Sequence, residues 1–587
     1  MASQIGDRGD LPSYDPIDLA ARYGLTPQRV PDNKPFAGEA NVGDARAFTV
    51  ARISGGAIAG NVPPVLADVR ATLLAKTQHA YFYAEDGLEV DRGALDAAAR
   101  DFEAVTWPRV TGKFGEPPTP GVDGDPRIIV LQADLGGAVG GYHSGDDIYP
   151  REVRPPSNEA EMIYIDRSLP AGGASFDAVI AHELQHLIHE RNDRDEEAWV
   201  NEGLSEVAFG LVAGSISTVS SFTARPETQL NRWETTGSLP HYGASAAFFT
   251  YLDGRFGDNA AGRVAMEPGD GIAGVSEFLA SMAGVPVFRD IFADWIAANI
   301  LNRSAGPYGN PGTRVEASVE SSLSVGDTVD GDATQFGTDY YSLDGLGVGD
   351  YTVQFSGQNE VAVLPVESPD DGFYWSNSGD GIDTTLTSSE IDLTSLPDAA
   401  LTFRTWYDIE RWYDWGYVSL SADGGTTWRT LPGEQTSTDN PVRMAYGPGY
   451  TGKSGGAEPE WVDERIDLSA YAGQKILLRF EYATDGATHG EGWIIDDVSI
   501  HGVASQPSWQ PRGWVNVDGK LPQTYVVRII GERADGEAVV LDVPLDAAQA
   551  GVLRFDATRL RNAVLAVAGT TEGTNQRSPY NVTLERP

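Results

Sequence analysis

The feature that most constrains the fold is a change in hydrophobic periodicity near residue 312. Apolar side chains recur at helical spacing in four stretches, 175–191, 195–214, 241–257 and 288–301. From residue 315 onward, short alternating runs are separated by Gly, Asp and Ser turns, which is typical of β-sandwiches. Short apolar strands such as "RIIVLQADL" precede the helices. We therefore predict a multidomain chain, with an α+β domain followed by all-β domains.

Composition limits the partners. The 587 residues include 85 acidic and 42 basic side chains, a formal net charge of −43, which disfavours nucleic acid and anionic membrane surfaces. This excess of carboxylates also favours structural Ca²⁺ sites. The chain has no cysteine, which removes disulfides and cysteine-zinc sites. We find no apolar run of the ~20 residues that a membrane span needs.

One short motif carries the chemistry. Residues 181–190, "AHELQHLIHE", contain His182-Glu183-Leu184-Gln185-His186 on a predicted helix. Residues i and i+4 share a helix face, so His182 and His186 can hold one metal ion together. Glu183 points about 100° away and can act as general base on a water molecule that the ion activates. This pattern predicts a zinc-dependent hydrolase; a solvated helix with scattered histidines is the alternative.

The third ligand has to come from elsewhere. His189 is seven residues from His182, about 10.5 Å along a helix, so one ion cannot bind both His182 and His189. We expect His189 to support the site or line a cleft. The next helix offers Glu202 and Glu206 in "WVNEGLSE", again on one face. One of these carboxylates can bind the metal, while the other can accept a hydrogen bond from a ligand imidazole.

The combined pattern, H-E-x-x-H followed by N-E-x-x-S-acid, resembles the gluzincin (thermolysin-like) metallopeptidases, and its short spacing is closer to the hyicolysin-type enzymes. The resemblance implies a zincin-like domain in which Glu202 is the third zinc ligand and Glu206 supports a ligand histidine. It also implies an oxyanion stabiliser on a later helix, for which "LPHYGAS" offers Tyr242, with His241 as the alternative. We expect the strand in "EMIYIDRS" to be the sheet edge that pairs with extended substrate.

The β-rich half supplies a second resemblance. Residues 366–501 are similar to the C-terminal β-sandwich of the immune inhibitor A family, through "YWSNSGDGID", "GYTGKSGG" and "GWIIDDVSI". This implies a secreted bacterial metallopeptidase whose signal peptide is not in this sequence. The family carries H-E-x-x-H-x-x-G-x-x-D, whereas His189 and Asn192 stand at the last two of those positions here. That departure disfavours a metal role for residue 192 and favours Glu202.

These observations give a domain plan: an extended arm (1–45), the metallopeptidase domain (46–312), a jelly-roll-like sandwich (366–504) and a small β domain. We hypothesise that the small domain is split between 313–365 and 505–587. The acidic turns "SGDGID" and "IDDVS" are candidate calcium sites, with at most one of Asp496 and Asp497 as a side-chain ligand. The expected function is a monomeric, secreted zinc endopeptidase acting on proteins or peptides. The alternative is a secreted adhesion or binding protein with a degenerate protease-like domain.

Overall fold

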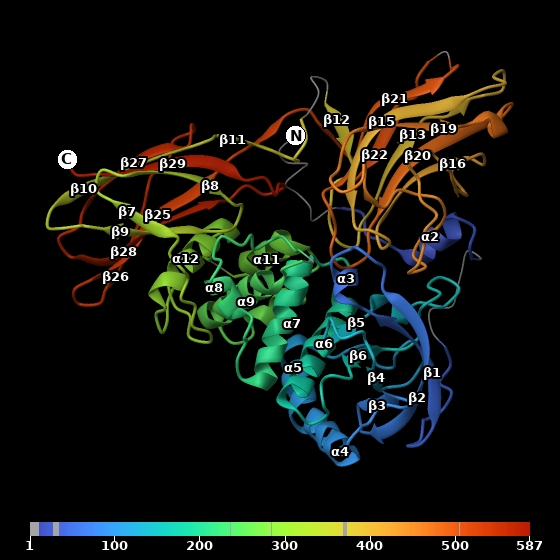
Figure 1. The fold of residues 1–587 in the computed structure, drawn as a ribbon, viewed down its shortest axis with the longest axis horizontal. Helices are drawn as coiled ribbons and strands as arrows, with labels where there is room; N and C mark the ends of the chain where they lie inside the picture. The colour runs from blue at the N-terminus through green and yellow to red at the C-terminus, as the bar shows by residue number, and fades with distance from the viewer. Residues whose placement is uncertain (1–10, 27–33, 235, 283, 368–371, 504) are drawn as a thin grey trace.

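The chain folds into an α+β region followed by two all-β regions (Figure 1). The computed structural model describes residues 11–26, 34–234, 236–282, 284–367, 372–503 and 505–587. In Figure 1 the N-terminal sheet and helices lie at the bottom, one β-sandwich stands above the sheet, and the second β domain lies beside the helices. The predicted fold class, an α+β region followed by β-sandwiches, is confirmed. Among the described residues, no helix is long and apolar enough to cross a bilayer.

The N-terminal region is built on a six-stranded mixed sheet. Its strand order is β1-β2-β3-β4-β6-β5, with β3, β4 and β6 parallel and the rest antiparallel to their neighbours. The strands are β1 (Ala45–Arg52), β2 (Val65–Lys76), β3 (Ala80–Glu85), β4 (Ile128–Ala133), β5 (Gly141–His143) and β6 (Met162–Asp166). All residues of β4 and β6 are buried, as expected for central strands covered on both faces.

The prediction of the sheet edge was wrong. The strand in "EMIYIDRS" is β6, which lies between β4 and β5. The edge is the three-residue strand β5, which pairs antiparallel with β6. Since β5 is too short to show a period-2 pattern, its sequence gives no strand signal of its own.

The four predicted long helices are present and cover the sheet and one another. They are α6 (Ala174–Asn192), α7 (Ala198–Ala213), α9 (Leu239–Phe256) and α12 (Phe288–Leu301). One core joins them to the sheet, with Trp199 stacked on Phe249 at 5.6 Å between ring centroids. Shorter helical segments fill the connections: α3 (Gly55–Ile58), α4 (Arg92–Asp101), η2 (Phe102–Thr106), α5 (Trp107–Phe114), η3 (Gly145–Ile148), α8 (Val219–Thr223), α10 (Ala260–Val264) and α11 (Gly271–Ala280).

The N-terminal arm is not wholly extended, which corrects the prediction for 1–45; residues 1–10 and 27–33 lie outside the described part. Helix α2 (Pro16–Arg22) begins where Asp15 accepts hydrogen bonds from two backbone N–H groups and Pro16 occupies the first turn. Arg22 then pairs with the buried carboxylates of Asp383, at 2.6 Å, and Glu481, at 3.3 Å. The arm is therefore anchored on the upper sandwich by ion pairs, which hydrophobic periodicity cannot reveal.

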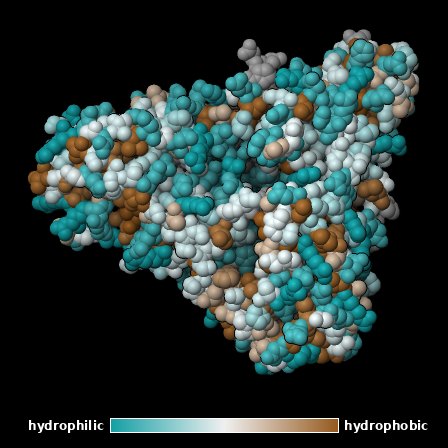
Figure 2. Space-filling model, viewed as in Figure 1, coloured by the Kyte–Doolittle hydropathy of each residue, from teal (hydrophilic) through white to brown (hydrophobic). Residues whose placement is uncertain are grey.

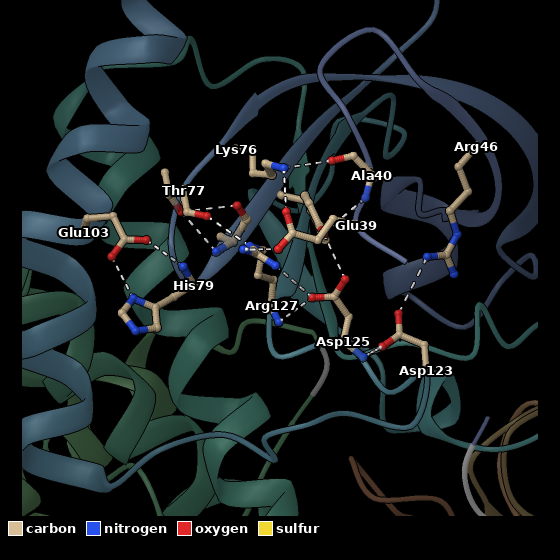
Figure 3. Close-up of polar contacts among 12 residues, drawn as sticks. Glu39, Ala40, Arg46, Lys76, Thr77, His79, Glu103, Asp123, Asp125 and Arg127 are labelled. Atoms are coloured by element: carbon tan, nitrogen blue, oxygen red, sulfur yellow. Dashed lines mark hydrogen bonds and ion pairs between the residues drawn. The ribbon is translucent and has the colours of Figure 1, made fainter. Parts of the chain in front are cut away.

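The end of the arm is tied to the sheet by a polar network (Figure 3). Glu39 pairs with Lys76 at 3.1 Å and with Arg127 at 3.2 Å, and the hydroxyl of Tyr81 donates to Asp125 at 2.9 Å. These contacts fix the path of the chain into β1.

The upper sandwich consists of two facing sheets. Their orders are β18-β15-β21-β12-β23, with β19 beside β15, and β17-β16-β20-β13-β22, with β14 beside β20. Trp493, Phe480 and Trp514 pack between them. The strands are β12 (Phe373–Trp375), β13 (Asp383–Ser388), β14 (Ile391–Asp392), β15 (Ala400–Ile409), β16 (Trp415–Ser421), β17 (Arg429–Thr430), β18 (Gly452–Lys453), β19 (Val462–Asp467), β20 (Lys475–Ala483), β21 (Gly492–His501), β22 (Trp509–Arg512) and β23 (Val515–Val517). A short 3-10 turn, η4 (Ser469–Tyr471), precedes β20.

The second β domain draws strands from both sides of the upper sandwich. Its sheets have the orders β27-β10-β29-β8 and β26-β25-β28-β9-β7, so β8 and β10 pair with β27 and β29, and β9 pairs with β28. A separate pair, β11 with β24, lies between the two β regions. The strands are β7 (Ser321–Ser324), β8 (Thr328–Ala333), β9 (Asp339–Asp344), β10 (Asp350–Gly357), β11 (Glu360–Ala362), β24 (Lys520–Pro522), β25 (Tyr525–Arg533), β26 (Ala538–Asp542), β27 (Ala550–Asp556), β28 (Leu560–Gly569) and β29 (Ser578–Glu585).

Candidate metal centre

Helices α6 and α7 pack against each other and bring two histidines and a carboxylate together. His182 and His186 lie one turn apart on α6, and both side chains are 12% exposed. Glu202 comes from the second turn of α7. The two helices are joined by only five residues, so the chain folds back sharply enough for α7 to face the histidines.

The three donor atoms form a small triangle. His182 Nε2 lies 3.2 Å from Glu202 Oε2, His186 Nε2 lies 3.4 Å from the same oxygen, and the two Nε2 atoms are 3.1 Å apart. A tetrahedral zinc ion with bonds of ~2.0–2.1 Å requires donors about 3.3–3.4 Å apart. The donor types and the spacing therefore both fit a zinc ion.

The other ring nitrogens are held by α7. His182 Nδ1 lies 3.4 Å from Glu206 Oε1, and His186 Nδ1 lies 2.9 Å from Asn201 Oδ1 and 3.1 Å from Ser205 Oγ. Acceptors at Nδ1 favour the tautomer that carries its proton there, which leaves the Nε2 lone pairs directed at the shared point. The sequence had suggested Glu206 as the acceptor for a ligand imidazole. Sequence reasoning missed Asn201 and Ser205, although both lie within one turn of Glu202.

His189 is outside the triangle. Its Nδ1 lies 3.2 Å from Asn201 Oδ1, and the residue is 1% exposed. Burial, together with the neighbouring His186, lowers the pKa of His189 to about 4, so this ring is neutral near pH 7. Asn192, at the end of α6, lies against the backbone of Ala265 and the sulfur of Met266 rather than the triangle.

Glu183 lies beside the triangle, on the side of the sheet edge. A Cβ added at Gly141 of β5 would come within 3.1 Å of its Oε1, so this glycine leaves room for the carboxylate. Burial raises the pKa of Glu183 above its ordinary value, although the charges of His182 and His186 oppose the rise. A carboxylate with a raised pKa is suited to accept and then release a proton near neutral pH.

Glu202 has the opposite electrostatic character. Burial alone would raise its pKa, but the charge of His186 and the hydrogen bonds from both histidines hold the pKa of Glu202 well below its usual range. It is therefore an anion under all ordinary conditions, as a metal ligand must be.

The two candidates on α9 differ in position. The Tyr242 ring lies 6.3 Å from the His182 ring, and its hydroxyl interacts with Glu202. Trp233 packs edge-on against Tyr242 at 4.7 Å between centroids. His241 instead faces Glu234 at 4.0 Å. Tyr242 is thus the one beside the triangle, and Trp233, which the sequence did not single out, holds it in place.

The triangle opens into a cleft of about 2130 Å³ between the N-terminal region and the upper sandwich. Its walls include β5, Trp233 and, from the sandwich, Trp412 and His489. Figure 2 shows the molecule hollowed between these parts, with hydrophilic residues around the hollow. His143 of β5 lines the cleft too, and burial, followed by the nearby His186, lowers its pKa to about 3. An extended chain could lie in this cleft with its backbone beside the triangle.

Comparison with known proteins places the sandwich in a family. The immune inhibitor A-like MAM domain family matches residues 357–505. The pre-pro-metalloprotease PrtV of Vibrio cholerae serotype O1 is 33% identical over 127 residues, covering 22% of this chain and 13% of PrtV. Immune inhibitor A of Bacillus thuringiensis subsp. alesti is 30% identical over 176 residues, covering 28% of this chain and 24% of that protein. Bacillopeptidase F of Bacillus subtilis (strain 168) is 37% identical over 100 residues, covering 17% and 6% respectively.

The predicted resemblance to the immune inhibitor A family is confirmed, although the matches span less than a quarter of each relative's length. Two of these relatives are named as a metalloprotease and as immune inhibitor A itself. Over the sandwich the chain carries an immune inhibitor A-like MAM domain, and parts of the chain are similar to a bacterial metalloprotease and to immune inhibitor A.

Proposed function

We propose that this protein is a zinc-dependent endopeptidase whose ion is held by His182, His186 and Glu202. The single observation that carries the proposal is the donor triangle, with edges of 3.1, 3.2 and 3.4 Å. Among the described residues, two other groups of acidic side chains could hold a cation, but this is the one that includes imidazole nitrogen. Imidazole and carboxylate together favour zinc over calcium or magnesium.

Bound zinc would supply Lewis acidity, which makes water acidic enough to ionise near pH 7 and polarises a substrate carbonyl. Glu183 lies beside the triangle and is 5% exposed. Its role in the proposal is to accept a proton from the attacking water and to pass it to the amine that leaves. Glu206 and Asn201 orient the two imidazoles through Nδ1.

Tyr242 is proposed to donate its hydroxyl proton in a hydrogen bond to the developing oxyanion. Burial, and then the charges of Glu202 and Glu183, raise the pKa of Tyr242 well above its ordinary value, so the phenol keeps that proton. The free edge of β5 is proposed to pair with the backbone of an extended substrate.

The relatives' names support a proteolytic role, since the matched proteins include a metalloprotease and a bacillopeptidase. We propose protein or peptide substrates in the extracellular space, a monomeric state, and no nucleic-acid partner. The net charge of −43 supports the last point because it repels polyanions.

The test compares casein cleavage by the wild type and by Glu183→Gln at equal zinc content. We expect the wild type to cut and the variant to bind zinc while losing at least 10²-fold in rate, the size of a general-base contribution. Asp177→Asn, on the same helix and outside the cleft, serves as the matched control and should cut like the wild type. If neither the wild type nor the variant cuts although both hold zinc, the binding-protein alternative is the better account.

A further inference from the structure

The acidic turns expected to bind calcium already have protein partners. In "SGDGID", Asp380 contacts His489 Nδ1 at 2.7 Å and accepts a hydrogen bond from the backbone of Ala198, while Asp383 pairs with Arg22. In "IDDVS", Asp496 accepts a hydrogen bond from the backbone N–H of Asp497. Asp380 and Asp383 therefore each already contact a cationic side chain.

A different acidic group in the same sandwich has no such cationic partner among the described residues. Glu410 directly follows β15, Asp414 directly precedes β16, and Asp485 lies just after β20. Each offers a carboxylate oxygen, and these oxygens all lie within 4.8 Å of one another. The three residues meet at the end of the sandwich that faces the N-terminal region, and two of them, Glu410 and Asp485, line the cleft.

Two of their oxygens are buried without a hydrogen-bond partner. Asp414 is 0% exposed; one of its oxygens accepts from the backbone of Asp485 at 2.9 Å, and the other, Oδ2, has no hydrogen-bond partner. Glu410 Oε2 is buried and equally unsatisfied. The hydroxyl of Tyr482, itself 0% exposed and close enough for Asp414 to act on it electrostatically, is unsatisfied as well.

Protein cations do not compensate for this charge. Within the described ranges, no Lys, Arg or His nitrogen comes within 4.0 Å of a carboxylate of Glu410, Asp414 or Asp485. Arg154 attracts Asp485 only from a greater distance and pairs with Asp146 instead. Burial, and after it the neighbouring carboxylates, raise the pKa of Glu410 and Asp414 well above their ordinary values. Buried carboxylate oxygens with no cation or hydrogen-bond donor beside them would destabilise the fold at neutral pH.

We propose that Glu410, Asp414 and Asp485 bind a calcium ion at the seam between the sandwich and the N-terminal region. Ligand oxygens on opposite sides of Ca²⁺ are separated by about 4.6–5.2 Å, which accommodates carboxylate oxygens within 4.8 Å of one another. The donors are all hard oxygen atoms, which Ca²⁺ prefers. The unsatisfied oxygens of Asp414, Glu410 and Tyr482 can supply ligands beyond one oxygen from each of the three carboxylates.

The position of this site gives it a mechanical role. Asp380, which acts electrostatically on all three ligands, accepts the backbone N–H of Ala198, the first residue of α7. The adjacent Gly381 lies so close to the loop before α7 that a Cβ there would meet Asp195 at 2.7 Å. Since α7 carries Glu202, the ion would fix the sandwich against the helix that completes the zinc triangle. This inference does not depend on peptidase activity.

The first experiment is calcium titration of the full chain, zinc-loaded and freed of calcium by gel filtration, followed by calorimetry and thermal unfolding. We expect binding with a Kd of about 10⁻⁴ M or tighter, and a rise of about 5–10 °C in the Tm of the sandwich at calcium in 100-fold excess over Kd. Asp414→Asn and Glu410→Gln should each bind one calcium fewer and lose this rise. Glu458→Gln, whose carboxylate is 85% exposed on the same sandwich, is the matched control.

Hydrogen exchange of the wild type locates the ion without any substitution, so the test stands even if a variant fails to fold. Calcium should slow exchange in peptides spanning 408–416 and 484–488 and leave β25 and β28 unchanged. The proposal is overturned if the wild type binds no calcium below 1 mM. It is equally overturned if folded Asp414→Asn keeps the wild-type calcium stoichiometry. The same holds if calcium slows exchange only elsewhere, such as around the acidic group Asp193, Asp195 and Asp270.

Discussion

Gly203→Ala tests how α9 is held against α7. Gly203 lies on α7 next to the ligand Glu202, and α9 crosses it closely. A Cβ at this position would lie 2.7 Å from Phe249 Cδ2 and 2.7 Å from Ser245 Cβ. Ordinary carbon contacts are about 3.5–4.0 Å, so the helices would have to separate by roughly 1 Å.

The expected cost follows from two opposing effects. Overpacking of a rigid helix contact costs about 1–3 kcal/mol, whereas Ala in place of Gly within a helix contributes about 0.8–1 kcal/mol. We expect a net destabilisation of about 1 kcal/mol. Because α9 also carries Tyr242, we expect lower peptidase activity with unchanged zinc content.

Urea unfolding followed at 222 nm measures this effect, since nearly all helical signal comes from the N-terminal region. Gly112→Ala is the control, because it is also helical but has nothing within 4 Å of the added Cβ. It should raise the urea midpoint by the propensity effect alone. A Gly203→Ala protein as stable as Gly112→Ala would refute the close-packing argument.

Three further predictions concern the site and the sheet. Asn201→Ala should weaken zinc binding about 10–100-fold in a chelator competition, since His186 Nδ1 loses the nearer of its two polar partners; unchanged affinity would contradict the orienting role. Tyr242→Phe should lower kcat about 10²–10³-fold at full zinc occupancy in peptide-cleavage kinetics. A wild-type kcat would mean that another group stabilises the oxyanion. Burial raises the pKa of Glu161 to about 7, so folding stability should fall as pH rises from 4.5 through 7. Glu161→Gln should remove about 2 kcal/mol of that loss between pH 5.5 and 8.5, and equal pH profiles for wild type and variant would count against it.

Local pattern was enough to predict the long helices and the residues of the triangle. The spacing of His182 and His186 fixes a shared helix face, and "WVNEGLSE" follows too soon for anything but a tight return of the chain. The alternating runs after 315 predicted strands and turns correctly, because each hairpin is encoded within a few residues.

Contacts between distant segments could not be predicted in this way. The edge strand β5 has three residues and no periodicity, and Trp233 reaches Tyr242 only through a loop. Helix α2 did have a local signal, Asp15 before Pro16, but its role depends on Arg22 meeting Asp383, 361 residues away. Asp414 and Asp485 likewise meet only because β16 and β20 pair in the sandwich.

The most direct test of the central claim is zinc titration of the chelator-treated wild type, with calcium in excess, while casein cleavage is followed. The account predicts no cleavage without zinc, a linear rise in rate up to one equivalent, and no further rise beyond it. Cleavage that is independent of zinc, or a protein that binds one zinc and still fails to cut casein and peptides alike, would contradict it.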